Sequence, residues 1–285
     1  MSNIWKTGIL MAALTALMIL IGKVLGGTDG MFFAFAFALL INFASYWFSD
    51  KIILSIYRAK EVDAVKSPQL YSTVQHLANT MQLPMPKVYI VPSPSPNAFA
   101  TGRDPKHSAV AVTEGNLQLL NRDELEAVMA HEMTHIKNRD TLISTVAASL
   151  AGAVTMLARF AGMSAFFGGS RDDDRGGGGL AILIYLLAPL AALLIQLAIS
   201  RSREFMADEG SGRVTRRPAS LASALQKLVA SVKQAPMAAE PATAHLFIVS
   251  PFAGTGFIQL FSTHPPVEQR VEKLQELDKL IRAGK

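Results

Sequence analysis

The chain has 285 residues, a hydrophobic content of 50% and a mean hydropathy of +0.29, which is too apolar for an ordinary soluble domain. It contains no cysteine, which excludes a disulfide framework, a thiol nucleophile and a zinc site built on thiolates. The net charge of +5 comes from scattered basic residues, many beside apolar segments, so membrane orientation explains it better than a nucleic-acid partner.

Four apolar stretches are long enough to cross a bilayer, which requires about 20 mostly apolar residues in a helix. They cover residues 8–25, 31–48, 142–167 and 180–199. The first stretch is interpreted as an uncleaved span rather than a secretory signal. It is long, it lacks a small-x-small cleavage site, and a second apolar stretch follows almost at once. The glycine-rich residues 26–30 are expected to form the turn of this first hairpin.

The two polar regions of the chain are rich in lysine and arginine, whereas the short loops between the expected spans carry little positive charge. By the positive-inside rule, both polar regions and both termini face the cytoplasm. The sequence therefore predicts transmembrane hairpins at residues 1–49 and 142–199, and cytoplasmic catalytic regions at residues 50–141 and 200–285. An even number of crossings separates the two regions, so they can form one domain.

The polar regions have the periodicity of a mixed α and β domain. Helices are expected at residues 69–81, 122–137, 200–209, 219–233 and 266–282. Strands are expected at residues 87–91 and 108–113, with a short edge strand at 97–101 after a proline-rich connector. The helix at 200–209 is expected to end early, because glycines follow it at positions 210 and 212.

Residues 131–135 read His-Glu-Met-Thr-His within the segment patterned as a helix. At about 100° of rotation per residue, His131 and His135 fall on the same helical face, one turn apart. Both imidazoles can therefore reach one metal ion, while Glu132 flanks it. This arrangement is typical of a zinc hydrolase, although an exposed polar helix can contain the same five residues by coincidence.

A catalytic zinc site usually has three protein ligands, so the two histidines require one more. A third histidine shortly after the motif is excluded, because the chain has Asn138 and Thr141 at the positions that the metzincin pattern gives to glycine and histidine. The candidate is Glu204, with Asp208 one turn later placed to orient a zinc-bound histidine.

The alternative for Glu204 is a solvated surface carboxylate paired with Arg201 or Arg203. The expected topology favours the metal, because His135 lies just before the third span and Glu204 just after the fourth. A membrane hairpin would return Glu204 to the side and depth of the histidines, which places the active site at the bilayer surface.

In this interpretation zinc lowers the pKa of a water molecule to about 7 and polarises the scissile carbonyl. Glu132 accepts the proton and delivers it to the leaving amine. His264 is a candidate donor to the tetrahedral oxyanion, or equally a capping residue before the helix that Pro265 and Pro266 introduce. Asp140 either orients a zinc-bound histidine or marks the junction of helix and membrane.

Four motifs carry a resemblance to a known family. They read Asn-Ala-Phe-Ala-Thr-Gly at 97–102, His-Glu-Met-Thr-His at 131–135, Ser-Arg-Ser-Arg-Glu-Phe-Met-Ala-Asp at 200–208 and Thr-His-Pro-Pro at 263–266. Through them the chain resembles the HtpX-type heat-shock membrane metalloproteases, which are gluzincins related to the CAAX-processing membrane proteases. The resemblance covers nearly the whole chain, including the order of the expected spans.

The resemblance implies a mainly α integral membrane protein with four transmembrane helices and a zincin-like α+β catalytic domain in the cytoplasm. It implies one Zn²⁺ per chain, held by His131, His135 and Glu204, with Glu132 as the catalytic glutamate. The implied activity is a zinc-dependent endopeptidase of the bacterial cytoplasmic (inner) membrane that degrades misfolded membrane proteins under stress. Its partners would be polypeptides and the lipid bilayer, and no nucleic acid.

The same resemblance gives a role to the first motif. Asn97, Ala98, Phe99 and Ala100 would form an edge strand that binds substrate backbone by strand addition. The alternative is a tightly packed strand beside the active helix.

Two other functions were weighed against general proteolysis. CAAX-type peptide processing requires a chamber for a prenylated peptide, and four spans are too few to enclose a large one. A non-enzymatic membrane adaptor with structural or sensory zinc would need a fourth ligand, and no residue presents itself convincingly for that role. We therefore expect general proteolysis of polypeptides.

Overall fold

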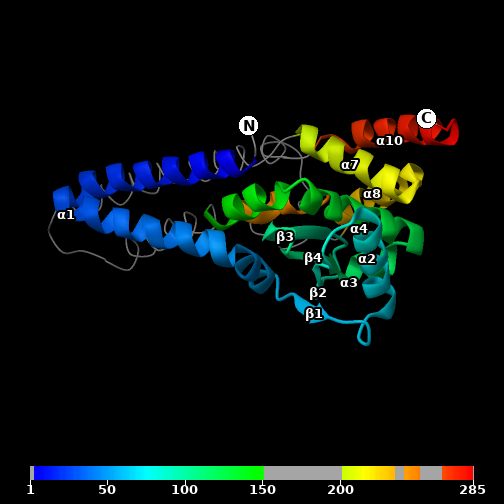
Figure 1. The fold of residues 1–285 in the computed structure, drawn as a ribbon, viewed down its shortest axis with the longest axis horizontal. Coiled ribbons are helices and arrows are strands. Elements are labelled where there is room, and N and C mark those ends of the chain that lie inside the picture. Colours follow the sequence, from blue (N-terminus) through cyan, green and yellow to red (C-terminus); the bar gives the residue numbers. More distant parts are fainter. Residues whose placement is uncertain (1–2, 151–200, 235–240, 251–264, 285) are drawn as a thin grey trace.

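The computed structural model describes residues 3–150, 201–234, 241–250 and 265–284. The described residues form a long helical arm and a catalytic region in which a four-stranded sheet packs against helices (Figure 1). The arm is α1 (Asn3–Ile56). The expected span at 142–167 is described only in its first residues, as part of a helix from Asp140 to Leu150, and the span at 180–199 lies outside the described residues.

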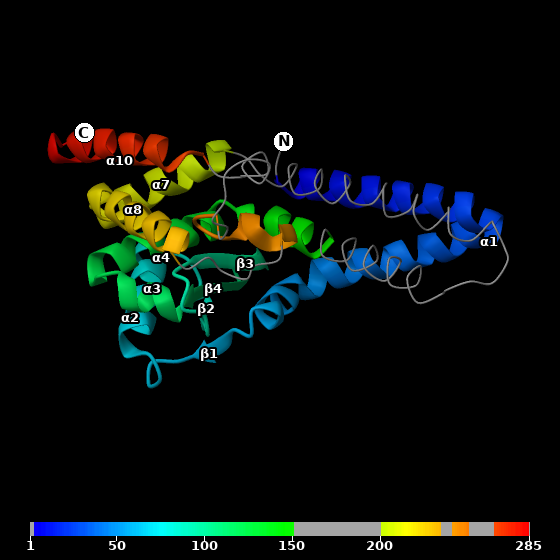
Figure 2. The ribbon, with the colours of Figure 1, turned by 180° about the vertical axis from the view of Figure 1, so that it is seen from behind.

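The arm α1 folds back on itself near Gly27, so that its two halves run side by side (Figures 1 and 2). Gly27 has a φ of +61°, and a Cβ atom on Gly22 would lie 2.4 Å from the carbonyl oxygen of Gly30. Further along, the Asn42 side chain donates a hydrogen bond to the Thr15 hydroxyl at 2.8 Å. The reversal falls where the sequence predicts a turn, but the residues around it are helical rather than a loop, because glycines permit the close approach.

Among the described residues, only the second half of the arm is a helix long and apolar enough to cross a membrane. Residues Gly27–Ile56 form 30 helical residues that are long and apolar enough to cross a bilayer, and most of their side chains are not buried inside the protein. The first half contains a shorter apolar stretch, Trp5–Leu20. Large apolar side chains of the arm, such as Phe32 and Phe33, are exposed, as expected for surfaces that face lipid.

The sheet has the strand order β1-β2-β4-β3, with β2 and β4 parallel and the other pairs antiparallel. Its strands are β1 (Lys60–Val62), β2 (Lys87–Val91), β3 (Ala98–Asp104) and β4 (His107–Thr113). The strand that carries the Asn-Ala-Phe-Ala motif is therefore an edge strand, and it extends three residues beyond the expected segment at 97–101. β1 has no counterpart among the expected strands, because three residues are too few to show a period.

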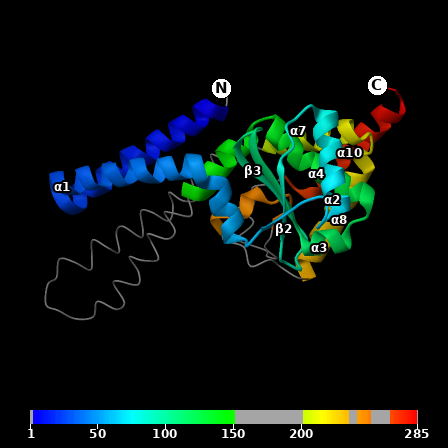
Figure 3. The ribbon, with the colours of Figure 1, turned by 60° about the horizontal axis from the view of Figure 1, so that its bottom comes forward.

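The described helices outside the arm include α4, which carries the His-Glu-Met-Thr-His motif. They are α2 (Pro68–Met81), α3 (Glu114–Leu119), α4 (Arg122–Lys137), α7 (Arg201–Thr215), α8 (Pro218–Gln234), the short 3-10 helix η1 (Pro241–Leu246) and α10 (Val267–Arg282). Helices α2, α7 and α8 and strand β3 all contact α4, as the view in Figure 3 shows for α2, α7 and β3.

The start of α4 is fixed by a capping box. The Asn121 side chain accepts a hydrogen bond from the Glu124 backbone, and the Glu124 carboxylate accepts one from the Asn121 backbone. The same carboxylate accepts hydrogen bonds from Ser223 and Lys227 of α8 at 2.7 and 2.8 Å. The beginning of α4 is therefore joined to α8, and the helix that holds the two histidines cannot rotate freely.

Helix α7 is longer than the sequence indicates. It continues to Thr215, so the expectation that it ends near Glu209 is wrong. The small residues that suggested an early end are contact residues: a Cβ atom on Gly210 would lie 2.5 Å from the Thr134 side chain of α4. Next to it, the Ser211 hydroxyl donates a hydrogen bond to the Ala127 carbonyl at 2.6 Å. Close packing on α4 outweighs the low helix propensity of glycine and places Glu204 opposite the histidines.

Candidate active site

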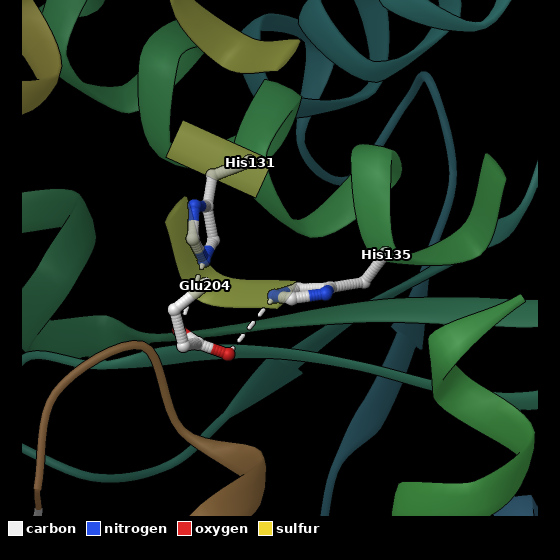
Figure 4. A group of neighbouring side chains, drawn as sticks. All are labelled: His131, His135 and Glu204. Atoms are coloured by element: carbon white, nitrogen blue, oxygen red, sulfur yellow. Dashed lines mark ion pairs between the residues drawn. The ribbon is translucent and has the colours of Figure 1, made fainter. Parts of the chain in front are cut away.

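Three side chains from two helices point toward one another and form a group that could hold a metal ion (Figure 4). His131 and His135 lie one turn apart on α4, and Glu204 lies on α7. Their candidate ligand atoms all lie within 4.8 Å of one another. The Glu204 carboxylate is 3.8 Å from Nε2 of His131 and 3.5 Å from Nε2 of His135. Ligands about 2.1 Å from a tetrahedral ion lie about 3.4 Å apart, so the group fits a zinc-sized ion.

His131 is fully buried, and its environment favours a neutral imidazole. Its Nδ1 lies 3.0 Å from Asp208 and its Nε2 lies 3.8 Å from Glu204, and neither nitrogen has a hydrogen bond of good geometry among the described residues. Burial lowers the pKa of His131 to about 4, against the opposing influence of Asp208. A buried nitrogen without a partner is costly, and a metal ion at Nε2 would satisfy it. Asp208 thus lies where the sequence predicts a residue that orients a histidine.

His135 is half-buried and lies between two carboxylates. Its Nδ1 is 3.2 Å from Asp140, and its Nε2 faces Glu204. Burial alone would lower the pKa of His135, but the hydrogen bond to Asp140 and the charge of Glu204 raise it to about 9. The imidazole must lose this proton before it can bind a metal ion, so metal binding is expected to release a proton. Of the two interpretations of Asp140, the contact with His135 favours an orienting residue.

Glu132 lies beside the metal-binding group and is not part of it. Its side chain is buried, and the backbone N–H of Ala100 on β3 donates a hydrogen bond to it. Burial raises the pKa of Glu132 to about 7, against the opposing charge of His135. A carboxylate with a pKa near neutrality can both accept and return a proton, which is the property required of a general base.

The residues of the Asn-Ala-Phe-Ala motif have different surroundings. Ala100 lines the cleft of the metal-binding group, together with Glu132 and both histidines. The Phe99 ring is buried away from that cleft, in edge-to-face or tilted contact with Tyr57 and Phe247. Asn97 and Ala98 are fully buried, and both are hydrogen bonded to the segment that follows η1. His264, the candidate oxyanion donor, lies outside the described residues.

Arg270 of α10 is a residue of the site that the sequence analysis missed. Its guanidinium is completely buried and makes two hydrogen bonds to Asp208, at 2.8 and 2.6 Å. It also lies 3.9 Å from Glu204. Arg270 therefore compensates two buried carboxylates, one of which contacts His131.

A signal for Arg270 was present in the sequence. It falls at a core position of the apolar stripe of α10, whose other buried members are Val271, Leu274 and Leu277. An arginine at such a position is rarely buried unless it is paired with an acid.

The contact between His135 and Asp140 gives a testable prediction. Replacing Asp140 by Asn removes the charge that orients the imidazole. Mutation of a residue that orients a metal ligand typically lowers metal affinity by about 10- to 100-fold. We expect Asp140→Asn to weaken zinc binding by that factor, measured by competition with a chelator of known affinity. Asp104 is a matched control, because it contacts His107 at 2.9 Å on the surface, and Asp104→Asn should leave zinc affinity unchanged. Equal affinities of the two variants would contradict a role for Asp140.

Comparisons with known proteins agree with this geometry. The family model described as peptidase family M48 matches residues 64–278. A Protease HtpX homolog from Thermococcus kodakarensis is 56% identical over 275 residues, with 95% of each chain covered. Another, from Syntrophobacter fumaroxidans, is 51% identical over 282 residues, covering 97% of this chain and 100% of that relative.

A solved structure has the same fold. The crystal structure of S. mikatae Ste24p matches 95% of this chain and 66% of that chain, with a TM-score of 0.52 and 17% identity. The resemblance that the four motifs indicate is therefore confirmed at the level of the family. The chain belongs to peptidase family M48 and is a metalloprotease that acts on polypeptides.

Proposed function

We propose that the chain is a zinc-dependent endopeptidase in which His131, His135 and Glu204 hold the ion. The observation that carries this proposal is the convergence of their ligand atoms, one of them a buried nitrogen without a partner among the described residues. Two nitrogens and one carboxylate form a ligand set that suits zinc and leaves a position for water and substrate. Asp208 orients the imidazole of His131 through its Nδ1, and Asp140 orients the imidazole of His135 in the same way.

The proposed role of Glu132 follows from its position. Bound zinc supplies Lewis-acid chemistry, making a water molecule more acidic and polarising the peptide carbonyl. Glu132 takes the proton from the water and then delivers it to the nitrogen of the departing amine. Its raised pKa allows it to do both near neutral pH. We assign donation to the developing oxyanion to His264, on the basis of the sequence motif alone.

We further propose that the protease is a multi-pass protein of the cytoplasmic membrane, with four spans and a catalytic site that faces the cytoplasm. The apolar helix Gly27–Ile56 and the distribution of positive charge along the chain support this orientation. Its substrates in this proposal are misfolded or damaged membrane proteins. A site that lies where the membrane arm joins the catalytic region could reach polypeptide segments that emerge from the bilayer.

The experiment that tests the proposed function uses the full chain purified in detergent. Cleavage of an unfolded, casein-type substrate and zinc content are measured on the same sample. About one zinc per chain together with cleavage supports the proposal. One zinc per chain without cleavage of casein or of an unfolded membrane protein would overturn it and favour a structural or sensory zinc site.

A further inference from the structure

A short segment that starts at the last residue of η1 lies at the free edge of β3, beside the proposed zinc site. We call residues 246–249 the strap; it belongs to the orange segment next to β3 in Figures 2 and 3. The backbone N–H of Ile248 donates a hydrogen bond to the Ala98 carbonyl at 3.1 Å. The Asn97 side chain donates another to the Val249 carbonyl, also at 3.1 Å. The strap thus already uses part of the strand edge at which substrate is expected to bind.

A third hydrogen bond joins the strap to the site itself. Arg270, which also binds Asp208, donates through Nη1 to the Ile248 carbonyl at 2.8 Å. All three bonds involve backbone groups of two consecutive strap residues, Ile248 and Val249. Every peptide chain carries the same backbone groups, so the backbone of another polypeptide offers the same donors and acceptors to these partners.

The strap also forms part of the wall of the cleft that contains the metal-binding group. Leu246, Phe247 and Ile248 line the same cleft as His131, His135 and Glu204. Leu246 is only 8% exposed and Phe247 is not exposed at all. A polypeptide that reached Ala98 along β3 would therefore compete with the strap for the Ala98 carbonyl.

The strap is held by contacts that lie away from the metal-binding group. The Phe247 ring packs edge-to-face on Tyr57 at the end of the arm, with ring centroids 5.1 Å apart. The Tyr57 hydroxyl is hydrogen bonded to the Thr243 hydroxyl of η1, and His245 is 3.0 Å from the Ser144 carbonyl. These contacts tie the strap to the membrane arm and to the helix that starts at Asp140.

We propose that the strap is an internal pseudosubstrate. It occupies the hydrogen-bonding group of the β3 edge at Ala98 that an extended substrate would use, and it has to leave that edge before a polypeptide can be cleaved. The inference rests on the proposed function, because it assumes that substrate binds along β3. Loosening the contacts that hold the strap should therefore raise activity without changing the metal site.

The first test is Tyr57→Phe in the full-length, zinc-loaded protein. The variant loses the hydroxyl that binds Thr243 and keeps the ring that packs on Phe247. One hydrogen bond of ordinary strength changes the ratio of bound to released strap about fivefold, so kcat/KM for casein should rise about fivefold. Thr243→Val removes the other partner and should give the same increase. Tyr89→Phe is the matched control, because its hydroxyl binds Glu61 away from the strap, and it should leave activity unchanged.

The second test follows the strap directly. Because the chain has no cysteine, Leu246→Cys introduces a single thiol, here combined with Glu132→Gln to prevent cleavage. Maleimide labelling should be slow in the free protein and at least about tenfold faster with saturating unfolded peptide. If the peptide slows the labelling of Cys at position 246 or leaves its rate unchanged, the proposal is overturned, because the strap is then a fixed wall of the cleft.

The outcomes separate the two proposals. If the wild type binds zinc and never cleaves, the proposed function fails. If the wild type cleaves, but Tyr57→Phe and Thr243→Val cleave no faster than Tyr89→Phe, only the pseudosubstrate proposal fails. Zinc content, measured for every variant, identifies a variant that has lost its fold and not merely its strap contacts.

Discussion

Glu132→Gln is expected to reduce kcat/KM for an unfolded protein substrate by about 10³- to 10⁴-fold while the protein keeps its zinc. Glutamine has nearly the same shape as glutamate and can fill the same buried position against Ala100. It cannot accept a proton from water at any pH at which the protein is folded. The loss should therefore appear in the catalytic step and not in metal binding or in folding.

The measurement is the initial rate of substrate cleavage, with zinc content determined on the same preparation. Glu126→Gln is the matched control, because Glu126 lies on the same helix and, within the described part of the chain, makes only long ion pairs, at 3.9 Å, with His76 and Arg217. Its activity should equal that of the wild type. A Glu132→Gln variant that cleaves at a tenth of the wild-type rate or faster would show that another group acts as the base.

Glu204→Ala is expected to abolish the stabilisation that zinc gives to the folded protein. A ligand present at a thousand times its Kd stabilises the folded state by about 4 kcal/mol, which appears as a large rise in the thermal unfolding midpoint. Without Glu204, this group of described residues offers the metal ion only the two histidines. The variant should be purified with little zinc, and added zinc should hardly shift its unfolding midpoint.

Glu209 provides the control for this variant. It lies on the same helix, α7, but its side chain is 54% exposed and pairs only with Arg213 on the surface among the described residues. Glu209→Ala should keep one zinc per chain and the full thermal shift, because an exposed ion pair contributes little. If Glu204→Ala still binds one zinc with the same thermal shift, the third ligand lies elsewhere in the chain.

The parts of the site that the sequence could predict are those whose positions depend on local periodicity. His131 and His135 share a face because α4 is a regular helix, and Asp208 follows Glu204 by one turn for the same reason. The edge position of the strand that contains Ala98 could likewise be expected from the preceding prolines. In each case the relevant residues are near neighbours in the sequence.

The parts that could not be predicted depend on contacts between distant segments. Arg270 joins the site through a pairing with a residue 62 positions earlier, and no local pattern specifies its partner. The strap has no periodic signal, because its hydrogen bonds with the Ala98 carbonyl and the Asn97 side chain connect residues far apart in the chain. The length of α7 does not follow from helix propensity, because the close contact of Gly210 with Thr134 of α4 keeps this segment helical.

The burial of Arg270 has a consequence for biosynthesis. The ribosome makes α4 and α7, with the three candidate zinc ligands, before it makes α10. Until α10 docks, the Asp208 carboxylate, which contacts His131, lacks the two hydrogen bonds that Arg270 donates to it. We therefore expect the site to acquire its final arrangement only after the last described helix has been made.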